Sequence, residues 1–337
     1  MTKILVYGDT HFSEYSSIIR GLGEKYTVRL ENLIKSINWV ERLAKNKECN
    51  LIVNLGDFFD KPDLTSQEIS AFKDINWASD IPHIHLCGNH EMGSSKHEYS
   101  SCNMFSVIEN HEVISKPAIY YHGEKKIGFL PYILDSNKEA LNTYFPEKCD
   151  IIFSHNDIKG IQMGSIMSTA GFEIDEIHSC CDLFINGHIH NGMRISNKII
   201  NCGNLTGQNF SEDAFNYKHR ALIIDVVTGA VEEIENPHAF NFYKVTSCDS
   251  FDFSSLKSNA ITSIECNSSN INEIKEKIKK SSILFNRFIS KGINSNSTLD
   301  NEEKSLAIDH IEEFKKFMLY NIANDNLIYE ELGEICK

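Results

Sequence analysis

Short apolar runs alternate with stretches of helical periodicity along the first two-thirds of the chain. Five runs have the length of strands that are buried on both faces: 4–7, 51–55, 84–86, 151–154 and 183–186. Between the first two runs, apolar residues recur near a 3.6-residue period, which predicts a helix over roughly 29–45. A second helix is expected over 65–78, before Asp80-Ile81-Pro82. This alternation predicts an α/β fold.

The remaining pattern predicts two hairpins and a change of organisation near residue 235. Segments 118–121 and 126–130 flank one glycine-containing turn, and segments 221–227 and 231–234 flank another. We expect a main domain over 1–235 and a small α+β cap over 236–290, with its clearest helix at 271–284. A polar, flexible linker is expected over 291–305. The last segment, 306–337, has an apolar stripe at helical spacing, which fits a partner-binding helix and packing on its own domain equally well.

Composition limits the class of protein. The 337 residues carry a formal net charge of −14, whereas a protein that grips nucleic acid alone is usually basic. A nuclease whose partner supplies that grip remains compatible. The ten cysteines form no CxxC pair, which favours reduced thiols in the cytoplasm, or the host cytoplasm for a phage protein. No apolar run is long enough to cross a membrane, and the first one is too short for a signal peptide.

Each of the five predicted strands ends in a short polar cluster of metal-ligand type. In chain order the clusters are Gly8-Asp9-Thr10-His11, Gly56-Asp57-Phe58-Phe59-Asp60, Gly88-Asn89-His90-Glu91, Ser154-His155-Asn156-Asp157 and Gly187-His188-Ile189-His190-Asn191. Because ligands gather at the carboxyl ends of strands in open α/β sheets, we expect these clusters to meet. Any one cluster alone is more often a turn, so the prediction depends on their succession.

The types of ligand indicate the chemistry. Seven candidates are too many for one tetrahedral ion and suffice for two ions that share a carboxylate: Asp9, His11, Asp57, Asn89, His155, His188 and His190. Oxygen and nitrogen donors without thiolates suit Mn²⁺, Fe²⁺ or Zn²⁺. Two such ions activate water and clamp a phosphoryl group, so phosphate ester hydrolysis is the expected reaction.

This succession of motifs resembles the calcineurin-like metallophosphoesterase superfamily over roughly residues 1–235. The resemblance implies a β-sandwich of two mixed sheets flanked by helices. It also implies that Asp9, His11, Asp57 and His190 hold one metal, and that Asn89, His155 and His188 complete the second with Asp57 as the bridge. His90 would then be a catalytic residue that faces the scissile phosphate and protonates the leaving oxygen.

Within the superfamily the chain is similar to the SbcD-type nuclease subunits of double-strand-break repair. The resemblance lies in Gly56-Asp57-Phe58-Phe59-Asp60, Ile81-Pro82 before the third motif, Phe129-Leu130-Pro131-Tyr132, and Cys202-Gly203-Asn204-Leu205-Thr206 after the last motif. It implies a DNA exonuclease and endonuclease in repair and recombination, with two divalent ions that we expect to be Mn²⁺. The implied partners are DNA ends or hairpins, an SbcC-type coiled-coil ATPase and a second copy of the chain.

One position departs from the SbcD pattern and keeps alternatives open. The acid after His90 is usually Asp and here is Glu91, which we expect to orient and charge the catalytic histidine. Glu at this place is typical of serine/threonine protein phosphatases, the second hypothesis. That branch carries a phosphate-binding Arg where this chain has Lys61, which cannot supply the bidentate contact. The third hypothesis is a non-catalytic scaffold of the same fold.

Overall fold

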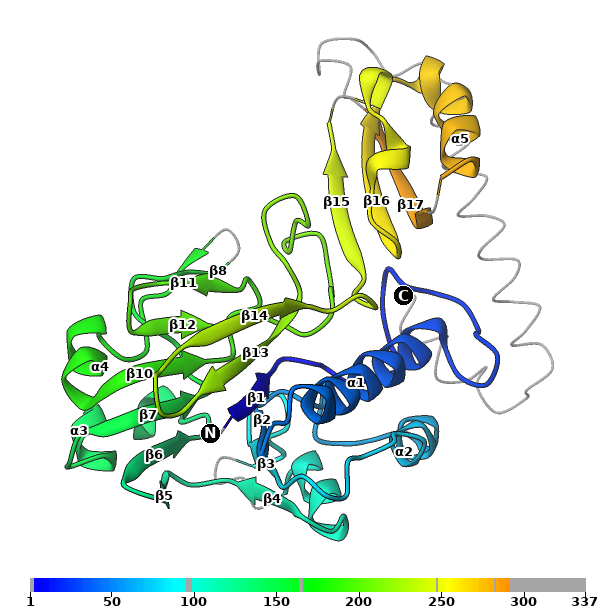
Figure 1. Ribbon diagram of the computed structural model, residues 1–337. Coiled ribbons are helices and arrows are strands. Elements are labelled where there is room, and N and C mark those ends of the chain that lie inside the picture. The colour runs from blue at the N-terminus through cyan, green and yellow to red at the C-terminus, as the bar shows by residue number, and fades with distance from the viewer. Residues whose placement is uncertain (1–2, 95–98, 164–165, 247, 282, 291–337) are drawn as a thin grey trace, which may run out of the picture. The chain divides into compact units, whose positions relative to one another are not determined.

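Two six-stranded sheets form the centre of the protein (Figure 1). The computed structural model describes residues 3–94, 99–163, 166–246, 248–281 and 283–290. In the first sheet β1 to β4 are parallel, and the hairpin of β13 and β14 adds antiparallel strands beside β1. Its order is β14 (Val231–Glu235), β13 (Arg220–Asp225), β1 (Lys3–Tyr7), β2 (Leu51–Asn54), β3 (His83–Leu86) and β4 (His111–Ile114).

The second sheet is also mixed. Its central strands are parallel, and an antiparallel strand closes each edge. Its order is β11 (Met193–Arg194), β12 (Ile199–Asn201), β10 (Cys181–Asn186), β7 (Cys149–Ser154), β6 (Lys125–Leu130) and β5 (Ala118–His122). Both hairpins expected from the sequence, β5 with β6 and β13 with β14, are therefore present.

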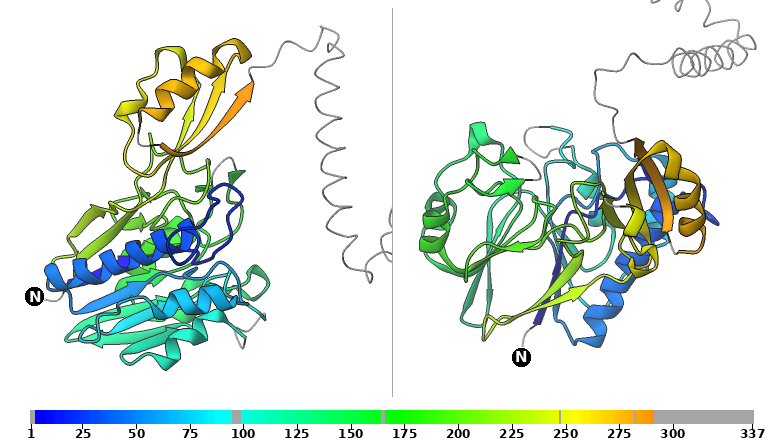
Figure 2. Two further views of the ribbon diagram at one scale, coloured as in Figure 1. Left: turned by 90° about the vertical axis from the view of Figure 1, so that its right-hand side faces the viewer. Right: turned by 90° about the horizontal axis from the view of Figure 1, so that it is seen from above.

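Alternating residues of the same strands face different layers, which explains the continuous apolar runs. Ile4 and Val6 of β1 pack between the sheets with Ile151 and Phe153 of β7. Leu5 and Tyr7 face the opposite side, where α1 (Val28–Asn46) and α2 (Ser66–Lys73) cover the first sheet. The outer face of the second sheet packs on α3 (Leu141–Tyr144) and α4 (Ile174–Cys180). Figures 1 and 2 show these helices on the two outer faces, which confirms the expected sandwich of mixed sheets flanked by helices.

A smaller sheet follows the sandwich. Strands β15 (Asn241–Val245), β16 (Ala260–Cys266) and β17 (Ile283–Ser290) form it, with α5 (Ile271–Lys279) packed on one face. A two-stranded sheet joins β8 (Gln162–Met163) to β9 (Ile166–Met167). The 3-10 helices are Ser101–Val107, Asp135–Asn137, Cys248–Ser250, Phe253–Ser255 and Ser268–Asn270. One compact unit spans Met1–Ile289, and the expected linker and C-terminal segment at 291–305 and 306–337 lie outside the described residues.

Two helices end earlier than their patterns predict. Thr65 and Glu68 form a capping box that starts α2, but this helix ends at Lys73 instead of continuing to residue 78. The next backbone groups bind side chains of α1, because the amide of Asn76 donates to Asn38 and that of Ala78 donates to Glu41. Beside the three-stranded sheet, the expected helix over 271–284 ends at Lys279 because the following residues enter β17.

The cysteines of the described part are not joined in disulfides, and all of them are buried: Cys49, Cys87, Cys102, Cys149, Cys180, Cys181, Cys202, Cys248 and Cys266. All of them except Cys87 and Cys102 belong to apolar clusters, where burial disfavours the thiolate. Burial raises the pKa of Cys202, for example, to about 12. Within the described ranges, no helix combines the length and the hydropathy needed to span a bilayer.

An aromatic cluster between the first sheet and its helices gives a test of the packing. The ring of Phe105 is fully buried, 3.5 Å from that of His85 and 4.9 Å from that of Phe58, measured between centroids. We expect Phe105→Ala to lower the free energy of unfolding by about 3–5 kcal/mol, because it removes these contacts and leaves a cavity. Chemical denaturation measures the loss. Val107→Ala, in the same 3-10 helix but 83% exposed, is the matched control and should change little; equal losses would contradict the packing.

Candidate metal centre

The carboxyl ends of strands from both sheets bring the polar clusters together. Hydrogen bonds between backbones tie their turns to one another: the amide of Asp9 donates to the carbonyl of Gly56 at 3.0 Å. The amide of His11 donates to the carbonyl of Asp57 at 2.9 Å, and that of Gly187 to the carbonyl of Ser154 at 2.9 Å. Two further bonds join these pairs and the third motif: the amide of His188 donates to Oδ2 of Asp9 at 3.1 Å, and that of His90 to Oδ1 of Asp57 at 2.9 Å. Five separate segments of the chain thus meet at one edge of the sandwich, as the order of the motifs predicts.

The backbone at four of the seven predicted ligands lies in the left-handed region. The φ angles are 51° at Asp9, 48° at His11, 47° at Asp57 and 69° at His188. Non-glycine residues rarely adopt this conformation, and such strain concentrates at functional sites. The sharp turns after the strands direct these side chains into one space.

The first group of ligands contains Asp9, His11 and His190, which offer atoms within 4.8 Å of one another. The Nε2 atoms of the two histidines lie 3.0 Å apart. Each ring has its other nitrogen beside a carboxylate: Nδ1 of His11 is 2.9 Å from Asp60, and Nδ1 of His190 is 2.8 Å from Glu212. Because a carboxylate can only accept, both Nδ1 atoms carry hydrogen, and both Nε2 lone pairs point at the same place.

The second group contains Asp57, His155 and His188, again with ligand atoms within 4.8 Å of one another. Oδ2 of Asp57 is 3.1 Å from Nε2 of His155 and 3.9 Å from Nε2 of His11, so this carboxylate lies between the groups. Oδ1 of Asn89 lies 3.2 Å from Nε2 of His155 and 2.9 Å from Nδ1 of His188. The structure therefore brings all seven predicted ligands together and places Asp57 between the two groups, where the resemblance predicts a bridge.

The ionisable groups around Asp57 show that this buried arrangement requires a cation. Burial favours the neutral acid, yet the neighbouring histidines, first of all His155, hold the pKa of Asp57 well below its usual range. Conversely, burial opposes a charge on His155, but Asp57 raises the pKa of His155 to about 9. A buried carboxylate thus requires a cation beside it, which without a metal is a protonated imidazole.

The donor set fits two divalent ions. Oδ1 of Asp9 is fully buried and has no hydrogen-bond partner, which is costly for a carboxylate oxygen unless a cation meets it. The two groups of nitrogen and oxygen donors, joined by Asp57, provide three or more ligands for each ion. The absence of thiolates among them suits Mn²⁺, Fe²⁺ or Zn²⁺.

The third motif places His90 and Glu91 differently. His90 lies at the cleft and is 42% exposed; its amide donates to Oδ1 of Asp57 at 2.9 Å, and its Nδ1 lies 3.0 Å from the carbonyl of Asp60. Glu91 is fully buried, and its carboxylate accepts from the amides of Phe59 at 3.0 Å and Gly88 at 2.8 Å. The acid beside His90 is Asp60, 3.5 Å from Nδ1, in place of the expected Glu91.

The hydrogen bond that His90 donates to Asp60 outweighs partial burial and raises the pKa of His90 to about 9. Glu91 instead ties the second motif to the third through two backbone groups. The side chain of Glu is one methylene longer than that of Asp, which suits it to reach both amides. In the structure the carboxylate next to the His90 ring is that of Asp60, and Glu91 contacts backbone amides instead. The catalytic roles of His90 and Glu91 stay predictions.

Three further groups contact ring nitrogens of the histidine ligands, and the sequence pattern did not predict this role for any of them. Glu212 accepts from His190 and also from Asn204 and the amide of Gln208. Asp157 lies 3.4 Å from Nε2 of His188. The carbonyl of Leu55 accepts from Nδ1 of His155 at 2.8 Å. Such partners fix the tautomer and the orientation of each ring.

Four of the ligands line a cleft, and a second hollow shares the lining residue Asn89 with it. The first cavity, about 280 Å³, is lined by Asp57, Asn89, His90, His188, Ile189, His190, Asn191 and Ser211. The second, about 370 Å³, shares Asn89 with it and is lined by Met92, Gly93, Ser94, Tyr132 and Leu134. Space for a substrate therefore exists on both sides of Asn89.

Glu212 provides a test of the arrangement that does not depend on turnover. Glu212→Gln keeps the size of the side chain, but an amide cannot accept from His190 and from Asn204 and Gln208 at once. We expect metal affinity at the centre to fall about 10-fold to 100-fold, as measured by competition with a chelator. Glu173→Gln, which changes an exposed acid, is the matched control. Unchanged affinity in Glu212→Gln would show that His190 needs no such partner.

Comparisons with known proteins agree with this geometry. The sequence matches the family model of the calcineurin-like phosphoesterases over residues 2–192. Among curated proteins none matches the chain. Similar solved structures include an archaeal phosphodiesterase, with 14% identity over 69% of this chain and 99% of that chain and a TM-score of 0.35. Another is a dimetal phosphatase from Danio rerio, with 13% identity over 70% of this chain and 99% of that chain and a TM-score of 0.39.

These two structural similarities are too low to bear on the substrate. The family model, in contrast, covers more than half of the chain and contains all seven predicted ligands. This chain belongs to the calcineurin-like phosphoesterase family.

Proposed function

We propose that the protein is a two-metal DNA nuclease, the SbcD-type subunit of a complex that processes DNA ends in repair and recombination. It cleaves phosphodiesters with two divalent ions, Mn²⁺ in our proposal, held by the seven ligands. In this proposal it acts as a dimer together with an SbcC-type coiled-coil ATPase.

The shape of the cleft is the main reason to propose a phosphodiester substrate instead of a phosphomonoester. A phosphodiester extends from the phosphorus in two directions, whereas a monoester extends in one. The cavity at the metal ligands reaches Asn191 and Ser211 on one side, and the hollow that shares Asn89 reaches Tyr132 and Leu134. A chain of nucleotides has room on both sides of the centre.

The environment of Lys61 weighs against the protein-phosphatase alternative. In that branch an Arg at this position binds the phosphate of the substrate. Here Nζ of Lys61 lies 3.3 Å from the buried carboxylate of Glu68, at the start of α2. Its charge therefore serves the capping box of a helix, and the contact that distinguishes the phosphatases is missing at this position.

The chain's own groups have definite tasks in the proposed reaction. A pair of divalent ions in such a site activates water and neutralises charge on the phosphoryl group. The imidazole of His90, held at Nδ1 by the carbonyl of Asp60, leaves Nε2 to donate a proton to the departing oxygen. Asp57 fixes the backbone of His90 by accepting from its amide, so the bridge and the acid keep a constant distance.

The negative net charge of the chain is the reason to expect a partner subunit that binds DNA. The chain has a net charge of −14, and neither hollow at the centre is lined by Lys or Arg among the described residues. Affinity for DNA arises mainly from contacts of basic groups with phosphates. The centre can therefore bind one phosphate through its metals, while the grip on a long duplex comes from the ATPase subunit.

The decisive experiment is a nuclease assay with Mn²⁺ on linear duplex and hairpin DNA, with and without a candidate ATPase subunit and ATP. We expect degradation of both DNA substrates, faster with the ATPase, and no release of phosphate from phosphoserine peptides. Bis-p-nitrophenyl phosphate serves as the general diester control. Hydrolysis of this control and of the peptides, without cleavage of DNA, would replace the nuclease with a phosphatase.

Substituting His90 separates catalysis from metal binding. His90 also lies within reach of His11 and Asp57, so a ligand role has to be tested directly. We expect His90→Gln to lower diester hydrolysis by about 10²-fold to 10⁴-fold, the usual contribution of a general acid, with both metals still bound. Asp57→Asn, in contrast, should lose metal and activity together, whereas the exposed Asp63→Asn should lose neither. Metal analysis of the purified proteins gives the first readout; loss of an ion from His90→Gln would make His90 a ligand.

A further inference from the structure

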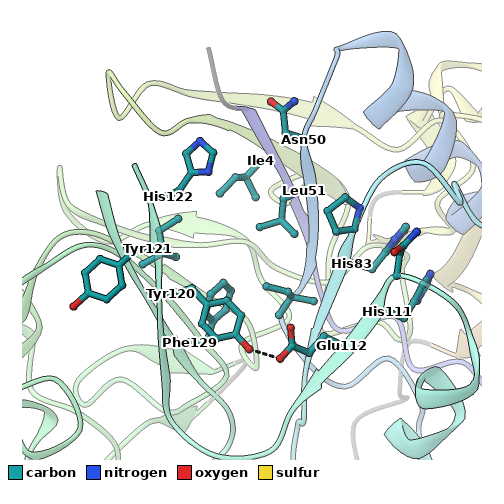
Figure 3. Close-up of a pocket in the computed structure, with 14 residues that line it drawn as sticks. Ile4, Asn50, Leu51, His83, His111, Glu112, Tyr120, Tyr121, His122 and Phe129 are labelled. Carbon is teal, nitrogen blue, oxygen red and sulfur yellow. Dashed lines mark hydrogen bonds between the residues drawn. The ribbon is translucent and has the colours of Figure 1, made fainter. Parts of the chain in front are cut away.

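A further cavity, of ligand size, lies at the opposite end of the parallel strands from the metal centre. Its volume is about 450 Å³, within the range of small-molecule sites. It is lined by the first residues of β2, β3 and β4 and by β1, β5 and β6, so both sheets contribute (Figure 3). Neither the phosphoesterase reaction nor the proposed nuclease function uses this space.

The walls of the cavity are apolar and aromatic. Ile4, Ile84, Ile127 and Phe129 belong to the core between the sheets and are at most 5% exposed. The ring of Tyr120 lies 5.3 Å from that of Phe129, with 59° between the ring planes, so two aromatic rings form one corner. Such a surface gains free energy when an apolar or aromatic body displaces water from it.

One carboxylate stands beside the aromatic corner. The hydroxyl of Tyr120 donates to Oε1 of Glu112, across the gap between β5 and β4 (Figure 3). This bond fixes the acid at one end of the cavity, while Asn50 and His122 lie toward the other. Within the described residues, the lining contains no Lys or Arg and no other acid.

Three histidines line the cavity, and the half-buried His111, next to Glu112 in the chain, does not offset this negative charge. Burial, together with His83, lowers the pKa of His111 to about 3, and Nδ1 of His111 lies 3.0 Å from Nε2 of His85. His83 turns its Nε2 toward Glu41 of α1, at 3.1 Å. A carboxylate held beside aromatic rings, in a lining without Lys or Arg among the described residues, is an environment that ammonium groups prefer.

We propose that this cavity, between β1–β4 and β5–β6, is a second binding site that takes a small organic cation with an apolar or aromatic body. The body lies against Ile4, Ile127 and Phe129, and the ammonium group lies between the ring of Tyr120 and the carboxylate of Glu112. The site is separate from the metal centre and does not depend on the proposed function.

The test compares two probes of similar size and opposite charge, 4-phenylbutylamine and 4-phenylbutyrate, on the full-length, metal-loaded protein. Isothermal titration calorimetry is expected to show the amine binding at least 10-fold tighter than the acid. Glu112→Gln should weaken binding of the amine about 10-fold. Glu124→Gln, an exposed acid in the turn after β5, is the matched control and should leave binding unchanged.

A variant that fills the cavity gives the second criterion. Ile127→Trp should abolish binding of the amine while hydrolysis of bis-p-nitrophenyl phosphate persists, because the metal centre lies at the other end of the strands. If thermal melting shows that this variant is unfolded, Leu51→Phe fills the space from the opposite sheet. Absence of amine binding, equal affinity for the two probes, or full binding by the filled variants would each overturn the proposal.

Discussion

The metal centre depends on the close approach of two backbone turns, those of Gly88 and Asp57. A Cβ atom at residue 88 would lie 2.1 Å from Oδ1 of Asp57 and 2.4 Å from its backbone nitrogen, so only glycine fits. This approach lets Asp57 accept from the amide of His90 and brings Asn89 beside His155 and His188. The two groups of ligands can share one carboxylate only because the second and third motifs are this close.

Those parts of the fold that depend on neighbouring residues in the chain could be predicted from the sequence. Strands buried on both faces give continuous apolar runs, and a glycine with an acid or amide directly after the run marks the end of the strand, as at Gly56-Asp57 and Gly88-Asn89. Asp9, Asp57 and Asn89 follow from that rule, and the four histidine ligands lie in the polar clusters at the ends of the same or neighbouring strands. Glu212 and Asp157 follow from no such rule, because their tasks depend on which ring nitrogen faces them after folding. The same limit explains Glu91, whose partners are backbone amides of two different loops.

The parallel strands of the sandwich separate two kinds of environment. At their carboxyl ends the loops carry carboxylates and imidazoles, strained turns and charges that require a cation. At their amino ends the space between the sheets remains partly open and is mainly apolar, with the single acid Glu112 among its described lining. One layer of core residues, including Val6, Val53 and Phe153, lies between these ends. Polar chemistry at one end therefore coexists with an apolar cavity at the other.

The distribution of cysteines has a consequence for observing how the protein opens. Cys49 lies in the cluster between the first sheet and its helices, Cys202 between the sheets, Cys149 and Cys181 against α3 and α4, and Cys266 in the small sheet. Each of these layers thus carries its own thiol, shielded until that layer separates. A thiol-specific reagent, followed residue by residue with mass spectrometry, would record the opening rate of every layer in the unaltered chain. The protein contains a built-in set of reporters for its own local unfolding.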